Sequence, residues 1–181
     1  MDNEKLLQAI ENNTLDQYMK EIGQDQLNLQ SFKLQVKFVN KSNNPDPAYA
    51  KDGDSGFDLR AFIDEPIVLK QFERFTVPTG LYLDLPSGFD AECRSRSGLA
   101  SKHGVMVLNS PGTVDNPYIG EIKVILINFG KEDFVINNGD RIAQCVIGTV
   151  SNANFLEFEK VDKINRVTER GDLGFGSSGV K

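Results

Sequence analysis

The chain has 181 residues, of which 39% are hydrophobic and 25% are charged, and its formal net charge is −6. This length suits one domain with an appendage and is enough to bury a real core. The acidic balance argues against a general nucleic-acid surface, because binding to a phosphate backbone needs clustered positive charge. The sequence has no run of about 18 apolar residues, and its acidic, polar start is unlike a signal peptide. We therefore expect a cytoplasmic protein that binds neither nucleic acid nor membrane.

Residues 1–31 are predicted to form a helical extension. Leu15, Tyr18, Met19 and Ile22 recur at the spacing that places side chains on one face of a helix. The spacing of its apolar residues differs from that in the rest of the chain, so we interpret the segment as an appendage. It either braces an assembly, contacts an unidentified protein partner, or does neither.

From residue 32 the apolar side chains recur with a period of two. In "FKLQVKF" (32–38), apolar and polar residues alternate. Similar runs occur later in the chain, separated by Gly, Pro, Asn and Asp: "FDLRAFI" (57–63), "LYLDL" (81–85), "FDAEC" (89–93), "KVILIN" (123–128), "DFVI" (133–136), "IAQCVIGTV" (142–150) and "FLEFEKV" (155–161). Many short strands at this spacing predict an antiparallel sandwich, jelly roll or barrel.

One stretch, "SGLASKHG" after Arg96, has the length of one or two helical turns. Ser97 lies near its start and Gly104 past its end. A helix N-terminus has unpaired N–H groups and partial positive charge, so it favours phosphate. The alternative is that Arg94 and Arg96 pair with surface carboxylates and Ser97 only caps the helix.

The stretch from "VMVL" through a Pro–Gly turn and "VDNPY" into the next strand is predicted to be a hairpin. Asn109 enters it, and Asp115 and Tyr118 lie beyond the turn. An aspartate at such a place is most often a turn former. Cys93 and Cys145 match no metal-ligand spacing and are expected to be free thiols in the core.

The last residues, "ERGDLGFGSSGVK", have two interpretations. A tail rich in Gly and Ser is often only flexible. Alternatively, glycine frees backbone N–H groups to turn toward an anion, with an arginine and serines adding donors and a phenylalanine stacking on a ring. The sequence motifs ahead of this tail decide between the two.

Five short motifs stand in order along the chain, and together they resemble those of the trimeric, all-β dUTPases. They are "DSGFDLRA" (54–61), "RSRSGLASKHG" (94–104), "NSPGTVDNPYIGE" (109–121), "GDRIAQCVI" (139–147) and "RGDLGFGSSG" (170–179). The similarity spans roughly residues 34 to 180. Each motif is modest alone, but five in order make chance agreement improbable.

This resemblance implies an enzyme that hydrolyses dUTP to dUMP and pyrophosphate with Mg2+, in a homotrimer whose active sites lie between subunits. The activity keeps uracil out of DNA and supplies dUMP for thymidylate synthesis. The implied fold is a distorted jelly roll or β-barrel over residues 32–165. Residues 1–31 precede it as the helical extension. Residues 166–181 come after it as a glycine-rich arm that closes over a neighbouring subunit's site.

The resemblance also implies roles for individual residues. Asp115 is the general base, Asp58 holds Mg2+ through water, Asn109 reads uracil, and Tyr118 packs on deoxyribose and leaves no space for a 2′-hydroxyl. The remaining substrate-binding residues are Arg96, Ser97, Gly98, Gly112, Val114, Gln144, Arg170, Phe175, Gly176, Ser177 and Ser178. The chain departs from the family pattern at Pro117, Ile119 and Leu173, among other positions, and Ile119 leaves open any contact that this side chain makes in relatives.

Two alternatives remain at this point. One is a dCTP deaminase-like enzyme, including a bifunctional one, which release of ammonia from dCTP would reveal. The other is a nucleotide-sensing protein that binds a partner on the same fold. The intact Asp115 and arm favour hydrolysis of dUTP.

Overall fold

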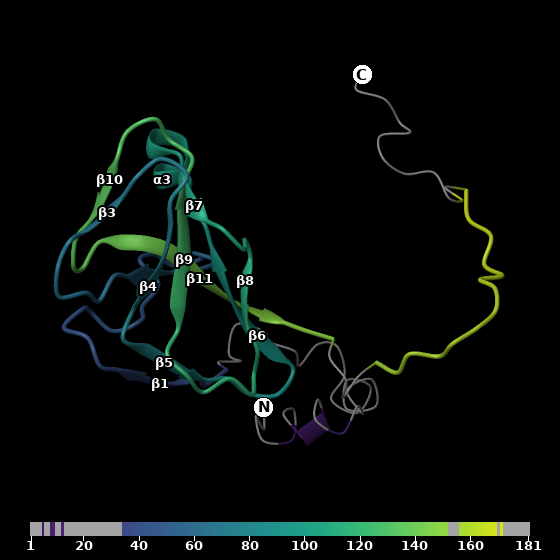
Figure 1. Cartoon of the computed structure of the whole chain (residues 1–181). Helices are drawn as coiled ribbons and strands as arrows, with labels where there is room; N and C mark the ends of the chain where they lie inside the picture. Colours follow the sequence, from purple (N-terminus) through teal and green to yellow (C-terminus); the bar gives the residue numbers. More distant parts are fainter. Residues whose placement is uncertain are drawn as a thin grey trace.

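A computed structural model of the chain describes residues 5, 8, 9, 12, 34–151, 156–169 and 171. Between residues 34 and 151 the chain forms short strands and one short helix (Figure 1). They are β1 (Lys37–Asn40), β2 (Phe57–Arg60), β3 (Ile67–Leu69), β4 (Arg74–Pro78), β5 (Leu81–Asp84), β6 (Phe89–Arg94), α3 (Ser97–His103), β7 (Val105–Val107), β8 (Gly112–Val114), β9 (Lys123–Asn128), β10 (Phe134–Ile136) and β11 (Arg141–Thr149).

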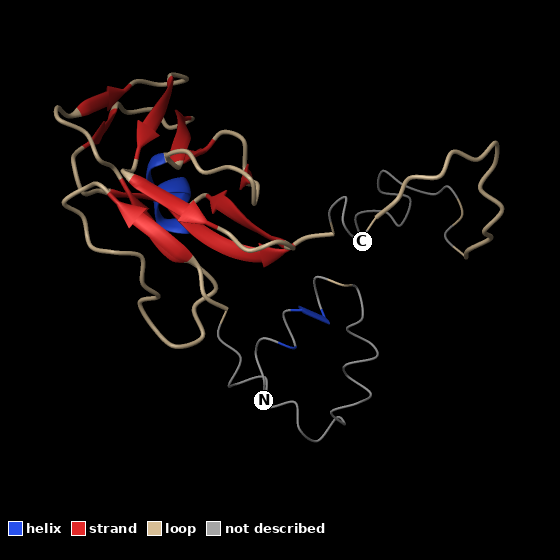
Figure 2. Ribbon diagram, turned by 90° about the horizontal axis from the view of Figure 1, so that it is seen from below, coloured by secondary structure: helices blue, strands red, loops and turns tan. Residues whose placement is uncertain are grey.

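The strands form four antiparallel sheets around one hydrophobic core. The largest has the order β2-β11-β6-β8, a second has the order β4-β9-β7, and the pairs β1-β5 and β10-β3 complete the set (Figure 2). Leu59, Leu126, Ile136 and Ile142 are among the side chains that fill the core. The all-β fold predicted from the period-two pattern is confirmed. Within the described residues, however, hydrogen bonds do not close the sheets into one continuous barrel.

Alternation along β2 separates the core face of the largest sheet from its outer face. On β2, Phe57 and Leu59 are buried, and Asp58 between them points outward. Gln144 of β11 lies opposite both Asp58 and Arg94 in the ladder. Directly opposed residues of antiparallel strands share a face. The polar side chains of three strands therefore meet on the outer face.

The predicted hairpin is present, with one addition. Strand β7 pairs with β9, so "VMV" and "KVILIN" form antiparallel neighbours. The connection between them, residues 108–122, crosses to the largest sheet, where its β8 pairs with β6. The third motif thus lies at the edge of that sheet.

Helix α3 begins at Ser97, and the residue at its N-cap is Arg96, with no side chain capping it. Ser97 is therefore not the cap that the sequence allowed. Gly104 ends the helix with φ of 67°. An added Cβ at Gly104 would lie 2.5 Å from the backbone nitrogen of Gly130, so only glycine fits there.

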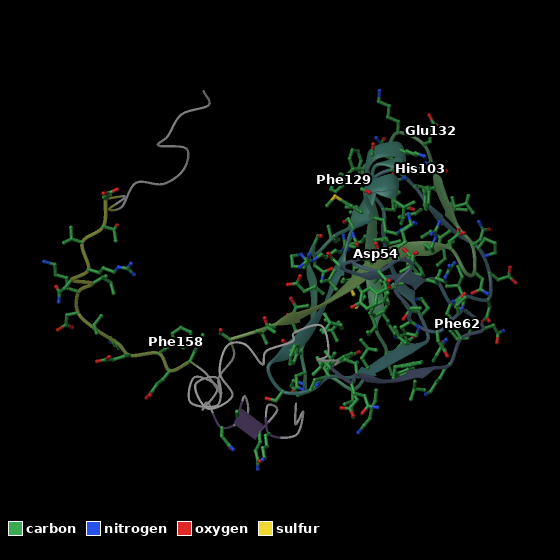
Figure 3. The ribbon with its side chains drawn as sticks, turned by 180° about the vertical axis from the view of Figure 1, so that it is seen from behind. Asp54, Phe62, His103, Phe129, Glu132 and Phe158 are labelled. Carbon is green, nitrogen blue, oxygen red and sulfur yellow. The ribbon has the colours of Figure 1, made fainter. Side chains whose placement is uncertain are left out.

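The prediction of a strand at 155–161 is wrong for the described part of that stretch. Residues 156–169 contain no strand and are exposed, and Phe158, labelled in Figure 3, is 96% exposed. A strand needs a partner for its backbone and cover for its apolar face. The rest of the described chain supplies neither to this segment.

The ends of the chain are described only in part. Near the start, Lys5, Gln8 and Ala9 have helical backbone, and the N–H of Asn12 donates to the carbonyl of Gln8 at 2.9 Å. Most of the predicted extension at 1–31 lies outside the described residues. So do the arm residues Arg170, Phe175, Gly176, Ser177 and Ser178. Among the positions that are described, no helix combines the length and apolar character needed to cross a membrane.

Candidate active site

Residues of the first, second and fourth motifs meet at one open cavity of about 280 Å3 on the outer face of the largest sheet. Asp54, labelled in Figure 3, marks the loop at its rim. Four predicted site residues beside Asp58 also line it. The lining residues are Ala48, Ala50, Asp54, Ser55, Gly56, Phe57, Asp58, Arg96, Ser97, Gly98 and Gln144.

Asp58 binds two arginines at this cavity. Its Oδ1 lies 3.1 Å from Nε of Arg96, and its Oδ2 lies 3.3 Å from Nη1 of Arg141. Arg96 also donates from Nη1 to the backbone oxygen of Arg141 at 2.8 Å. Of these three charged groups, Asp58 and Arg96 line the cavity together with Asp54, so Arg96 is the guanidinium that faces it and could bind a phosphate group.

The turn that carries Arg96 is fixed from both sides. Gln144 donates from Nε2 to the backbone oxygen of Ser95 at 3.0 Å, and the Ser95 hydroxyl accepts from the N–H of Val107 at 2.9 Å. Arg94, in contrast, pairs with Glu92 on its own strand at 2.8 Å. The alternative of arginines pairing with carboxylates thus applies to Arg94 and Arg96 alike. Only Arg96 lines the cavity.

The donor set at Asp58 fits magnesium in one specific way. Both oxygens of Asp58 already face arginines, and the described residues contain no group of three or more His, Cys, Asp or Glu that could hold a metal. Mg2+ in proteins commonly keeps several waters and uses one or two carboxylates together with substrate phosphates. Asp58 therefore fits a magnesium ion that arrives with a triphosphate, and does not fit a site made by protein ligands alone.

The third motif forms a separate, compact loop. Gly112 pairs with Cys93, and a Cβ added at Gly112 would lie 3.2 Å from Nδ2 of Asn109, so the Asn109 amide packs close against β8. The Tyr118 hydroxyl donates to the backbone oxygen of Glu121 at 2.9 Å. The Tyr118 ring lies over Gly120 and is about half exposed.

Asp115 directly follows β8, and its backbone oxygen accepts from the N–H of Tyr118 at 3.0 Å, which closes a turn. Asp58 lies on β2 and Asp115 directly after β8, and these two strands are the opposite edges of the same sheet. Three strand spacings of about 4.8 Å put them about 14 Å apart. A single subunit therefore does not bring the proposed base to the cavity that holds Asp58.

Two charged residues of this region were missed by the sequence reasoning. Arg141 reaches Asp58 because the ladder between β11 and β2 shifts register between Arg141 and Ala143. The adjacent apolar pair Ile142–Ala143 breaks the alternation and was the available signal for this bulge.

Asp90 is the second missed residue. It is only 6% exposed, and burial, helped by the negative charges of Glu92 and Asp115, raises its pKa. No sequence motif indicated that Asp90 is buried, because an aspartate on the outer face of a strand is normally solvated.

The dUTPase family model matches residues 42–179. The deoxyuridine 5'-triphosphate nucleotidohydrolase of Cytophaga hutchinsonii is 50% identical over 153 residues, covering 84% of this chain and 97% of that protein. The enzyme of the same description from Treponema denticola is 53% identical over 134 residues, covering 74% and 90%. Among solved structures, the Staphylococcus bacteriophage 80alpha dUTPase with dUPNHPP is similar with a TM-score of 0.70 and 26% identity, covering 82% of this chain and all of that one. The match of the family model over most of the chain shows that this protein belongs to the dUTPase family.

Proposed function

We propose that the protein hydrolyses dUTP to dUMP and pyrophosphate. The observation that carries this proposal is the position of Asp115, the proposed base, directly after β8 at one edge of a sheet whose other edge carries a cavity lined by Arg96 and the first turn of α3. Curated relatives of up to 53% identity are named deoxyuridine 5'-triphosphate nucleotidohydrolases, which supports the substrate. In a cell, such an activity in the cytoplasm would remove dUTP before polymerases use it and would supply dUMP.

The proposal includes a site shared between subunits. Because about 14 Å separates the two edges, the cavity of one subunit needs the third motif of another. The number of subunits, three, comes from the resemblance of the motifs to the trimeric dUTPases. The arm, with Arg170, Phe175, Gly176, Ser177 and Ser178, is proposed to close the site.

In the proposed reaction, Asp115 accepts a proton from a water molecule as the water oxygen bonds to the α-phosphorus. The bond between the α-phosphorus and the bridging oxygen to the β-phosphorus breaks, and pyrophosphate leaves. The Asp115 carboxylate at the end of β8 is the acceptor of this proton in the proposed step.

The cavity residues would hold the triphosphate in line for this attack. Arg96 would bind phosphate oxygens, with Ser97 and Gly98 at the first turn of α3 and the remaining N–H of the Gln144 amide beside it. Asp58 would hold Mg2+ through water, and the bound ion would neutralise charge on the phosphate oxygens.

The loop at 108–122 would select the nucleoside. The Asn109 side chain offers one donor and one acceptor to the imide edge of uracil, with backbone groups of Gly112 and Val114 beside it. The exposed face of the Tyr118 ring would pack on deoxyribose and exclude a ribose 2′-hydroxyl.

The test is a pyrophosphate-release assay with dUTP, dCTP, dTTP and UTP, run on the wild type and on Asp115→Asn. We expect cleavage of dUTP in strong preference to the others. Asp115→Asn should bind dUTP but lose about 100-fold or more in kcat, because it removes the base. Full turnover by this variant would refute the role of Asp115, and ammonia release from dCTP would favour the deaminase alternative.

A further inference from the structure

Asp90 lies next to Asp115 across two paired strands. Ala91 of β6 pairs with Val114, the last residue of β8, so the same register extended by one residue sets Asp90 opposite Asp115. Directly opposed positions of antiparallel strands have Cβ atoms about 5 Å apart and project to the same face. The two carboxyl groups also interact electrostatically.

On the side of Asp90 away from β8, the neighbouring residue is a glycine of β11. Gly148 of β11 pairs with Asp90, and a Cβ added at Gly148 would lie 3.1 Å from Oδ1 of Asp90. The Asp90 carboxyl thus occupies the space that a side chain at this position of β11 would need. This packing leaves Asp90 only 6% exposed.

The charges around Asp90 are unbalanced. Glu92 and Asp115 face it with negative charge, and Arg94 is the positive group that acts on it. Arg94 is itself engaged by Glu92 at 2.8 Å. On the β11 side, Gly148 offers no side chain. A carboxylate buried here raises the free energy of the folded state, so its position calls for an explanation beyond stability.

We propose that Asp90 is a positioning residue for Asp115, whose buried carboxylate repels that of Asp115 and directs it off the subunit's own sheet toward the substrate. This inference rests on the proposed function, in which Asp115 is the base. Asp90 does not touch the substrate or the attacking water. It acts through Asp115 alone, because it lies beside that residue on the same face of the sheet.

Asp90→Asn is the direct test, because the amide keeps the shape and removes the charge. An amide can also donate to the Asp115 carboxylate and hold it against the sheet. We expect kcat for dUTP to fall by about 10- to 100-fold, as for a misplaced catalytic group, with KM unchanged. Asp90→Glu, which restores the charge on a side chain longer by one methylene, should recover part of the lost kcat.

The matched control is Glu92→Gln. It removes a negative charge from the same face of β6 and also from the neighbourhood of Asp90, but position 92 lies opposite Thr113 rather than Asp115. Its kcat should equal that of the wild type. Gly148→Ala supplies an independent test, because its methyl group would press on Oδ1 of Asp90, shift it by a few tenths of an ångström, and should lower kcat at unchanged KM.

The pH profile separates positioning from a structural role. The pKa of Asp90 is raised, so the wild type should lose a component of kcat as pH falls through that value, and Asp90→Asn should lack this component. Wild-type kcat in Asp90→Asn, beside an inactive Asp115→Asn, would overturn the positioning role and leave the base intact. If both variants keep full kcat, the proposed function fails as well.

Discussion

Cys93 and Cys145 face each other directly across β6 and β11, and both are buried and free. Burial raises the pKa of Cys93 to about 11 and raises that of Cys145 as well. The sequence predicted free core thiols from spacing alone, and this is confirmed. Their pairing in register could not be predicted, because the sequence does not state which strands are neighbours.

These thiols should be inert in the folded protein. The thiolate is the reactive form, and at pH 8 a group with a pKa near 11 is almost entirely protonated and also shielded from reagents. We expect no reaction with a disulfide reagent such as DTNB at pH 8, and two thiols per chain after unfolding in guanidinium. Rapid labelling of the native protein would contradict this burial. The raised pKa also makes the free energy of unfolding depend on pH. The thiols ionise more readily in the unfolded chain, so the folded protein loses stability as the pH rises through the folded-state pKa.

In the loop at 108–122, the absence of a side chain at Gly120 leaves the space that the Tyr118 ring occupies. A Cβ added at Gly120 would lie 2.5 Å from both Cζ and Oη of Tyr118. Gly120→Ala should therefore push the ring away and break its hydrogen bond to the Glu121 backbone oxygen. Because this ring is proposed to exclude the 2′-hydroxyl, the ratio of kcat/KM for dUTP over UTP should fall about tenfold or more.

Steady-state kinetics with both nucleotides measure this ratio directly. The melting temperature should change little, because the Tyr118 ring is already about half exposed and can move into solvent. An unchanged preference for dUTP in Gly120→Ala would show that the ring does not discriminate the sugar.

The strands differ in how far the sequence could predict them. The alternation in β2 arises directly from one buried face, and β2, β6 and β9 all begin where the apolar runs placed them, although β6 and β9 also bury residues of their second face. Strand β8 has only three residues between Pro111 and Asp115, too few for a period. The contact of Arg141 with Asp58 depends on a bulge, and period-two reasoning assigns the wrong neighbour across a bulge.

The segment at 156–169 marks the limit of reasoning from one chain. Its apolar residues follow a strand-like pattern, yet Phe158 and Val167 are 96% and 95% exposed. An apolar pattern indicates that side chains become buried, but it does not indicate whether the same chain or another molecule buries them. The same limit applies to the candidate site. Its residue types and its division between subunits were implied by the motifs, whereas the placement of Asp58 and Asp115 at opposite edges of one sheet appears only in the fold.

The division of the site between subunits can be tested by mixing two inactive variants. Arg96→Ala removes a phosphate ligand from the cavity, and Asp115→Asn removes the base from the third-motif loop. If each site takes its cavity from one subunit and its base from another, a mixed trimer contains sites with both groups intact. Random mixing at equal amounts gives such a pairing in about a quarter of all sites, so we expect about a quarter of wild-type turnover.

The experiment requires unfolding and refolding the two variants together, and comparing the mixture with each variant refolded alone. Sedimentation of the mixture should show a single trimeric species, and activity should appear only in the mixture. A site built within one subunit gives a different result, because every site then carries one of the two defects and mixing restores nothing. Recovery of turnover on mixing would mean that the separation of about 14 Å between β2 and β8 is bridged by a second copy of the chain, and that the cavity at Asp58 is completed only on assembly.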